Sequence, residues 1–305
     1  MLFPLFYLKG CEGMVYKKTT PYLFILPGLL IVLMFIYYPV IENIYSSLFS
    51  WTPFSDTREF VQLHNYSRLF DDSIFFTAIK NNLIHSVISL LIQVFGALVL
   101  AAILEDTIFR KFSPLLRTVY FFPVLIPITV TGLLFSFIYN PQIGLLNKAL
   151  EVIGLGQYTT GWLGESGTAF YAVVAMGQWI GLGYTTMLFI VAIQNIPQEL
   201  YQAAKIDGCN KIQSFFYITV PQVKEMAFVV VIFTLSQSML TFADVYVLTK
   251  GGPGNSTQVL STYLYQKAFV DNEMGYASAI ANVIFLISIV FYIIQSKLFK
   301  SGERD

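Results

Sequence analysis

Polar side chains recur at helical spacing inside three long apolar stretches of the chain. One helical face of residues 81–104 carries Asn82, Ser86, Ser89, Gln93 and Gly96, with His85 at its edge. Residues 226–249 carry Thr234, Gln237, Thr241 and Asp244 at spacings of three, four and three, and residues 169–196 carry Gln178, Gly181 and Thr185. Hydroxyls, amides and a carboxylate on helices within a membrane favour a bundle interior or a wet cavity. The pattern predicts a path for a polar solute.

A packing role competes with this interpretation, because small and polar residues also enrich ordinary helix–helix contacts. For the single Ser, Thr and Gly residues, packing is the simpler explanation. For Gln237 and Asp244, solute contact and packing are about equally good explanations, since a larger polar group left unpaired in lipid is costly. Asp244 has a third explanation, because it lies near the end of its window and could reach the membrane interface. The candidate solute-path residues are Gln93, Gln178, Gln237, Thr241 and Asp244.

Motifs for enzymatic chemistry are missing from the sequence. No G-x-x-x-x-G-K-[ST] loop occurs, so this chain is not expected to hydrolyse ATP itself. The run Gly164–Gly167 has the wrong order for a nucleophile elbow, and neither His64 nor His85 lies in a H-E-x-x-H setting. Cys11 and Cys209 form no disulfide framework and no zinc-ligand spacing. We therefore expect no catalytic residue, no metal site and no cofactor.

The composition places the chain in a membrane. Hydrophobic residues make up 56% of it and charged residues only 12%, against about a quarter in soluble domains. Acidic and basic residues balance at 18 each, so there is no basic excess that would indicate nucleic acid. The lipid bilayer is the expected medium.

Six windows are long and apolar enough to cross a bilayer, which takes about 20 residues. They are Tyr22–Ile41, Asn81–Leu104, Val119–Tyr139, Ala169–Ile196, Met226–Thr249 and Ala277–Ser296. Backbone groups in lipid must bond within their own segment, so these windows should be helices. The expected fold is an all-α integral membrane protein with a six-helix domain over residues 22–299. Residues 1–21 would precede it, with Met14 as a possible alternative start, and residues 300–305 would form a tail.

The orientation follows from the distribution of lysine and arginine near the windows. The two termini and the loops after the second and fourth windows carry 12 of the 18 basic residues, and the other three loops carry 6. Both termini and the loop of residues 197–225 are therefore predicted to be cytoplasmic.

The loop from Pro197 to Glu225 reads as two short helices. Pro197 suits the first turn of a helix, Glu199 complements the positive end of its dipole, and Gly208 is expected where that helix stops. Ile212, Phe215, Phe216 and Thr219 then form one stripe of a second helix, which Pro221 should close. A structured loop of this kind is expected to pack against another surface.

These residues resemble the permease subunit of a carbohydrate-type ATP-binding cassette (ABC) importer. The family signature is Glu-Ala-Ala, three residues, Gly, nine residues, Ile, one residue, Leu-Pro; here it reads Gln202-Ala203-Ala204, Gly208, Ile218 and Val220-Pro221. Glu199-Leu200-Tyr201 and Ile206-Asp207 match the sugar-importer version. The resemblance covers roughly residues 22–299 and includes Arg117–Pro123, Asn140–Asn147, Gly251-Gly252-Pro253 and Gly275–Ala279.

The resemblance implies partners and site residues. Two cytoplasmic ATP-binding subunits, a second and non-identical permease, and an extracytoplasmic solute-binding protein would complete the importer in a bacterial or archaeal cell membrane. The ATPase-coupling residues would be Glu199, Gln202, Ala203, Ala204, Asp207 and Gly208. Gln202 replaces the usual Glu, which removes one ionic contact but retains hydrogen bonding; Cys209, Val220 and Glu225 also depart from the family pattern without changing its spacing.

Two other classes of protein remain open on the residues alone. A secondary transporter driven by an ion gradient usually places ionisable groups at mid-membrane, and only Asp244, near the end of its window, resembles one. A structural or assembly subunit would bind partners without transporting. The Gly251-Gly252-Pro253 turn is either a tight exit from the fifth window or a docking edge for an external partner.

Overall fold

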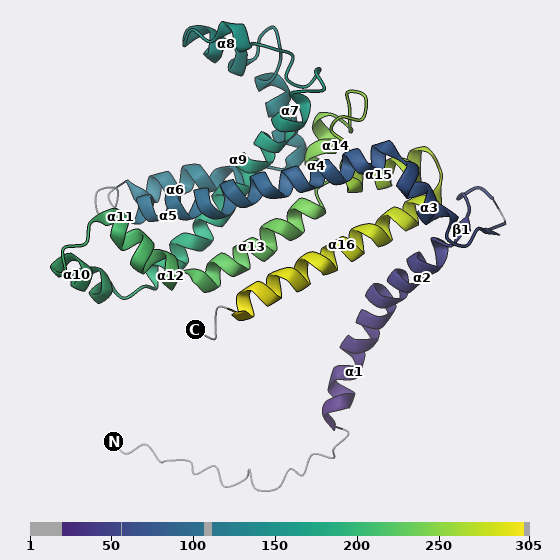
Figure 1. Ribbon diagram of the computed structural model, residues 1–305, viewed down its shortest axis with the longest axis horizontal. Coiled ribbons are helices and arrows are strands. Elements are labelled where there is room, and N and C mark those ends of the chain that lie inside the picture. Colours follow the sequence, from purple (N-terminus) through teal and green to yellow (C-terminus); the bar gives the residue numbers. More distant parts are fainter. Residues whose placement is uncertain (1–19, 56, 107–111, 302–305) are drawn as a thin grey trace, which may run out of the picture.

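The computed structural model describes residues 20–55, 57–106 and 112–301, and the possible start at Met14 lies outside them (Figure 1). Helices dominate these residues. The first half contains α1 (Thr20–Val32), α2 (Tyr38–Ser46), α3 (His64–Asp71), α4 (Ser73–Ser89), α5 (Ala97–Glu105), α6 (Ser113–Phe121), α7 (Ile128–Ile138) and α8 (Leu145–Val152). The second half contains α9 (Ala169–Gln194), α10 (Gln198–Ile206), α11 (Lys211–Ser214), α12 (Val220–Gln222), α13 (Lys224–Met239), α14 (Ala243–Leu248), α15 (Leu260–Tyr265) and α16 (Met274–Ser301).

Short segments of other kinds join these helices. The wider π turns are Leu33–Tyr37, Leu90–Gly96, Phe215–Thr219 and Gln266–Val270, and the tighter 3-10 turns are Phe122–Leu125 and Gly156–Tyr158. Strands β1 (Phe49–Ser50) and β2 (Glu59–Phe60) pair antiparallel, with Phe49 opposite Phe60.

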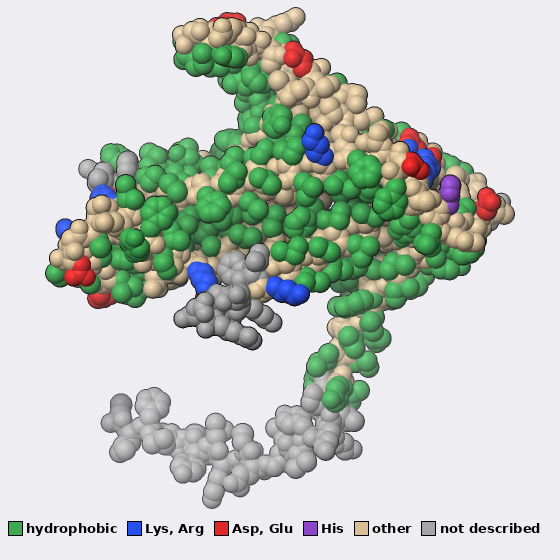
Figure 2. All heavy atoms as spheres, viewed as in Figure 1, with side chains coloured by type: hydrophobic (Ala, Val, Ile, Leu, Met, Phe, Trp, Pro, Cys, Tyr) green, Lys and Arg blue, Asp and Glu red, His purple; other side chains and the backbone are tan. Residues whose placement is uncertain are grey.

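The expected all-α membrane fold is confirmed. Four unbroken helical segments are long and apolar enough to cross a membrane: Tyr22–Ser46, Ser73–Glu105, Ala169–Gln194 and Met274–Lys297. Two bent pairs bring the number to six if each pair is one span. Hydrophobic side chains cover most of the flank of the bundle in the view of Figure 2, as a lipid-facing surface requires.

The third window is not the single straight helix that was predicted over Val119–Tyr139. The chain there bends by 103° between Ser113–Leu125 and Ile128–Ile138. Pro123 and Pro127 lie at the bend; proline has no N–H to donate and disfavours helical geometry in the residue before it. Val124 and Ile128, on the two sides of the break, line a cavity between the helices.

The prediction for the fifth window, Met226–Thr249, was also wrong in part. Helix α13 ends at Met239, residues 240–242 leave the helix, and α14 begins at Ala243. Helix α14 packs against α7, where a Cβ added at Gly132 would lie 2.2 Å from Cγ1 of Val247. The close approach of these two short helices sets the position of Asp244.

Packing of α5 against α9, with Val230 of α13, forms the main hydrophobic core of the described bundle. Ala97 and Ala101 on α5 are fully buried against α9, where Phe189 and Ile190 are also buried. A Cβ at Gly183 would lie 2.0 Å from the carbonyl oxygen of Tyr120, so only glycine permits this crossing of α9 and α6.

The first span stands apart from the bundle (Figure 1). None of the apolar window within Tyr22–Ser46 is buried, and Phe24 is 81% exposed. Its outer end alone is tied down: Asn43 Nδ2 donates to Oδ1 of Asn282 on α16 over 2.8 Å. Residues 22–39 of this span are exposed throughout, and only its C-terminal part, in α2, packs against α16.

A carboxylate joins three elements at the end of the bundle that carries α3. Asp72 caps α4 by accepting from the N–H groups of Ile74 and Phe75 at 3.0 and 3.2 Å, and its other oxygen accepts from the hydroxyls of Tyr263 and Tyr276. Partial burial opposes ionisation, but these hydrogen bonds outweigh it and hold the pKa of Asp72 below its usual value.

The lowered pKa of Asp72 predicts an acid-dependent contribution to stability. A depressed pKa stabilises the folded protein above the ordinary value of 3.8, and the contribution is lost as the pH falls through the folded value. We expect Asp72→Asn to unfold at a lower temperature than the parent protein at pH 7, with the difference shrinking below that ordinary value. Thermal unfolding of both purified proteins across this pH range measures it, and a difference independent of pH would contradict it.

Candidate coupling loop and solute cavity

The first half of the 197–225 loop is a helix with a glycine stop, as predicted. Helix α10 begins after Pro197 and ends at Ile206, with Glu199 in its first turn and Lys205 in its last. Gly208 follows with φ of +81°, a left-handed conformation that glycine adopts readily. The N–H of Cys209 then donates to the carbonyl of Ala204 over 2.9 Å and closes the helix end.

The second half continues further than predicted. Asn210 and Gln213 form a reciprocal capping box at the start of α11, each side chain bonding the other's backbone N–H over 2.9 Å. Pro221 was predicted to close this helix, and the helix ends one residue later, at Gln222, before a bend of 72° into α13. The π turn Phe215–Thr219 directly before Pro221 widens the helix where proline offers no N–H.

The predicted coupling residues share one exposed surface at this end of the bundle. Glu199, Gln202, Ala203, Asp207 and Gly208 are exposed, and Ala204 is half-buried. Large apolar side chains are exposed beside them: Leu200, Ile206, Ile212, Phe216 and Tyr217. We call this combined surface the coupling face. Exposed apolar groups among small and charged residues are typical of a surface that binds another protein.

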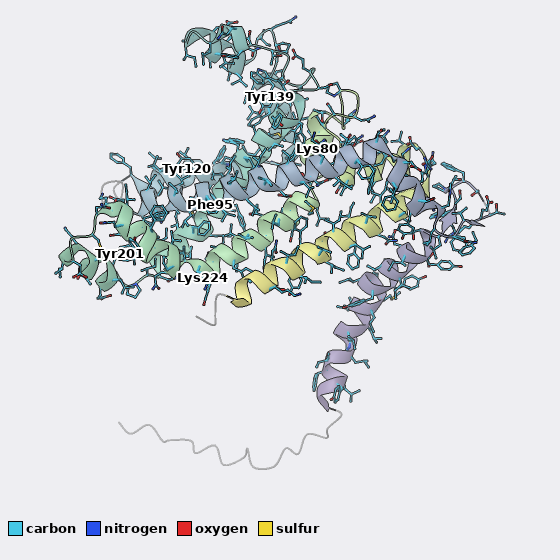
Figure 3. All side chains as sticks on the ribbon, viewed as in Figure 1. Lys80, Phe95, Tyr120, Tyr139, Tyr201 and Lys224 are labelled. Carbon is cyan, nitrogen blue, oxygen red and sulfur yellow. The ribbon has the colours of Figure 1, made fainter. Side chains whose placement is uncertain are left out.

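Specific bonds hold the coupling face to the bundle. The hydroxyl of Tyr201 lies 2.9 Å from that of Thr219, joining α10 to the second half of the loop (Figure 3). Lys211 Nζ donates to both carboxylate oxygens of Asp106, at 2.8 and 2.7 Å, just beyond the end of α5.

The neighbouring carboxylate, Glu105, forms bonds to two further spans. It pairs with Arg117 of α6 and accepts from Nε2 of Gln194 of α9 over 3.2 Å. The loop is therefore bonded to the end of the second span, and the adjacent Glu105 joins that end to α6 and α9.

A cavity of about 630 Å³ lies within the bundle, beside the break between α6 and α7. Its walls come from α4 and its π turn, α9, α13 and α14, together with Val124 and Ile128 at the break. Four of the five predicted solute-path residues line it: Gln93, Gln237, Thr241 and Asp244. Although the fifth window is broken, its polar residues still converge.

Gln178, the fifth predicted residue, does not line this cavity. It is 4% exposed; its Nε2 donates to Oγ of Ser89 and its Oε1 accepts from Nε2 of Gln93, both over 2.9 Å. The amide thus ties α9 to the second span. Asn82, Ser86 and Ser89 are buried between helices in the same way, which matches the packing interpretation.

Sequence reasoning missed Phe233 and Phe242, whose aromatic side chains line the cavity. Tyr184 lines it too, as does His85 from the edge of the predicted polar face. The rings of Tyr184 and Phe233 lie 5.2 Å apart, which joins α9 to α13. Aromatic residues are so common in this chain that no spacing rule separated these from the lipid-facing ones.

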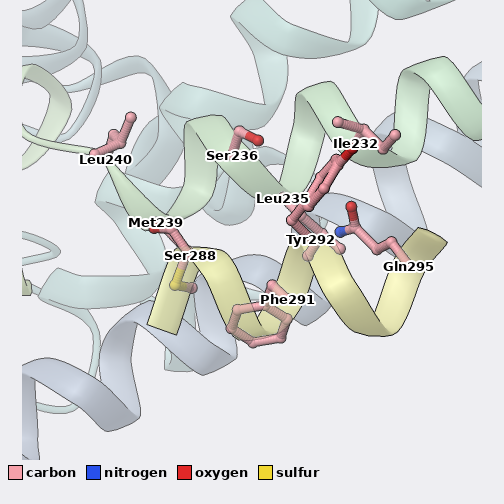
Figure 4. A pocket seen from close by; sticks show the side chains of 9 residues that line it. All are labelled: Ile232, Leu235, Ser236, Met239, Leu240, Ser288, Phe291, Tyr292 and Gln295. Carbon is pink, nitrogen blue, oxygen red and sulfur yellow. The ribbon is translucent and has the colours of Figure 1, made fainter. Parts of the chain in front are cut away.

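A second, smaller cavity of about 140 Å³ lies between α13 and α16 (Figure 4). Ser236, Ser288 and Gln295 are its polar members, and the remaining wall is apolar. Ser236 directly precedes Gln237, so neighbouring residues of α13 face different cavities.

The Gly251-Gly252-Pro253 turn is firmly built into the fold. Oγ1 of Thr257 donates to the carbonyl of Gly252 over 2.7 Å, and Nδ2 of Asn81 donates to the carbonyls of Ser256 and Gln258, both over 2.8 Å. These bonds favour the tight-exit interpretation of the turn.

A helical membrane bundle with a cavity among its helices and an exposed two-helix loop is the architecture expected of a permease subunit. A family model described as "Binding-protein-dependent transport system inner membrane component" matches residues 97–301. The chain belongs to this family and is a multi-pass membrane subunit of a binding-protein-dependent ABC importer, which confirms the resemblance found in its sequence.

Individual proteins support this assignment over nearly the whole chain. The chain is 52% identical to the probable ABC transporter permease protein YurN of Bacillus subtilis, covering 95% of this chain and 99% of that protein. It is 32% identical to the arabinooligosaccharides transport system permease protein AraP of Halalkalibacterium halodurans, covering 94% and 91%. The fold is similar to the crystal structure of a bacterial ABC transporter involved in the import of the acidic polysaccharide alginate, with a TM-score of 0.80 at 22% identity, covering 92% and 95%.

Proposed function

We propose that this chain forms part of the translocation path for a sugar or sugar-like solute and transmits ATP-driven movement to that path through the coupling face. The observation that carries the proposal is the coupling face itself: an exposed pair of short helices bonded to Asp106 at the end of the second span, in a bundle whose cavity has polar residues in its wall. The oligosaccharide named for the relative AraP supports the solute class.

The proposed partners follow from surfaces that the chain leaves open. Two cytoplasmic ATP-binding subunits supply the hydrolysis, and one of them receives the coupling face. A second, non-identical permease covers the detached span Tyr22–Ser46. A solute-binding protein delivers the solute outside, in the cell membrane of a bacterium or archaeon.

Reconstitution tests this function directly. The chain is purified with the products of its neighbouring genes, placed in proteoliposomes and supplied with a labelled arabino-oligosaccharide. We expect uptake that needs ATP and the binding protein and that persists when ionophores dissipate ion gradients. Uptake without ATP that ionophores abolish would instead identify an ion-driven transporter. Stable assembly without uptake of any tested oligosaccharide would favour a structural subunit.

The ion pair between Lys211 and Asp106 provides a further prediction. An exposed pair contributes only about 0.2–1 kcal/mol to stability, so its loss should leave the fold intact. We expect Lys211→Glu to reduce ATP-driven uptake several-fold, because it places two like charges between loop and bundle. The exchange Lys211→Glu with Asp106→Lys should restore most of the uptake. An exchange variant as impaired as the single one would contradict a role for this pair.

A further inference from the structure

Among the described residues that line the larger cavity, Asp244 is the only carboxylate, and none is a lysine or an arginine. Among the described residues, Asp244 takes part in no ion pair shorter than 4 Å; its hydrogen-bond partner is Thr241. A carboxylate within a bundle normally meets a cation or a set of hydrogen-bond donors. Here most of its acceptor sites face the cavity.

A glycine on α9 makes room for this carboxylate. A Cβ at Gly177 would lie 3.0 Å from Oδ2 of Asp244 and 3.8 Å from Nε2 of His85, so the two groups flank the same bare stretch of backbone. Nδ1 of His85 is buried without a hydrogen-bond partner among the described residues. The imidazole and the carboxylate thus come from the second and fifth windows to one point on the cavity wall.

The other polar groups of the wall suit a solute rich in hydroxyls. A carboxylate offers about four lone-pair sites to donors, and an amide offers both donors and acceptors. Gln93 and Gln237 supply the amides. Tyr184, Phe233 and Phe242 supply flat faces on which a sugar ring can pack. Among the described residues of this wall, the imidazole of His85 is the one basic group.

We infer that the cavity takes solutes that donate hydrogen bonds and carry no negative charge, namely neutral or amine-bearing polyols. Asp244 excludes carboxylated, sulfonated and phosphorylated sugars. Like charges repel, so the Asp244 carboxylate, with no lysine or arginine beside it in the described wall, is the excluding element. The inference rests on the proposed function, in which solute passes through this cavity. It separates this chain from the alginate importer, whose solute is acidic.

The local potential can be measured without knowing the natural solute. In the assembled complex, Cys11 and Cys209 are replaced by Ser, and a reporter cysteine is introduced by Gln237→Cys. The complex is treated at pH 8, where a histidine is ordinarily neutral, with two thiol reagents of similar size. One is the cationic trimethylammonioethyl methanethiosulfonate and the other the anionic sulfonatoethyl methanethiosulfonate. Mass spectrometry of this chain gives both rates. Ser236→Cys, one residue away and facing the smaller cavity, is the matched control.

We expect the ratio of cationic to anionic rates at Gln237→Cys to exceed the Ser236→Cys ratio by about tenfold. Adding Asp244→Asn should bring the two ratios within about twofold of each other. Gln93→Cys, on another wall of the same cavity, repeats the test if Gln237→Cys disturbs assembly.

Equal ratios with Asp244 present would overturn the inference. A cavity in which neither reporter reacts would also overturn it, because ions of this size would then be excluded whatever their charge. If the two thiol reagents show no charge preference with Asp244 present, while uptake still depends on ATP, this inference is refuted and the proposed function stands. If the cavity prefers the cationic reagent but uptake does not depend on ATP, the proposed function is refuted and the charge preference of the cavity stands.

Discussion

Replacing Gly208 with arginine is expected to abolish the association with the ATP-binding subunit and to reduce solute uptake at least tenfold. Gly208 holds φ of +81° in the middle of the coupling face, and no atom lies within 4 Å of the position that a Cβ would take. The new side chain would therefore meet nothing in this chain and would project from the surface proposed to bind the partner. The backbone strain costs about 1–2 kcal/mol, which leaves the bundle folded.

A second glycine in the chain provides the matched control. Gly154 has φ of +82° and the same open surroundings, but it follows α8, far from the coupling loop in the fold (Figure 1). Gly154→Arg therefore carries the same strain and the same charge without touching the coupling face. Co-purification of the ATP-binding subunit and uptake are measured for both variants. Equal losses in both would attribute the effect to strain, and full activity of Gly208→Arg would refute coupling through this face.

Asn82→Leu is expected to be the most destabilising single change in the second span. The side chain is 1% exposed; its Nδ2 donates to the carbonyl of Ser238 over 2.8 Å, and its Oδ1 accepts from the N–H of Leu260 over 2.8 Å. Leucine has a similar volume but would leave both backbone groups buried and unsatisfied, at about 1–3 kcal/mol each.

Thermal unfolding of the purified complex measures this loss, which we expect to lower the transition by several degrees. Thr186→Val is the control, because Thr186 is as deeply buried but bonds only to the carbonyl of Leu182 in its own helix. That variant should unfold within about a degree of the parent. An Asn82→Leu protein as stable as the control would show that these backbone groups find other partners.

The parts of this structure that depend on neighbours in sequence were predictable. Glycine at a helix end, the spacing of the signature and the length of the apolar windows are local features, and the structure retains α10 with its stop at Gly208. The bend in the third window also had a local signal in Pro123 and Pro127, which a count of apolar residues ignores.

The remaining features depend on which helices meet. No residue type marks the break after Met239, which accompanies the packing of α14 against α7 at Gly132. The amide of Gln178 bonds Ser89 and Gln93 because of how α9 and the second span are rotated relative to each other. A single sequence holds no information on that rotation. Solute contact by the residues of the larger cavity stays a prediction.

The detached first span separates insertion of this chain from its assembly. A helix of 25 residues with a strongly apolar window is stable in lipid by itself, since all its backbone bonds are internal. The bundle can therefore complete its own folding while residues 22–39 of this helix stay exposed, because the helix packs against the bundle only through its C-terminal part around Asn43. Capture of the helix by a newly made partner would then be the last step of biogenesis. A chain produced without that partner would keep this helix uncovered, which is a signal that membrane quality control could read.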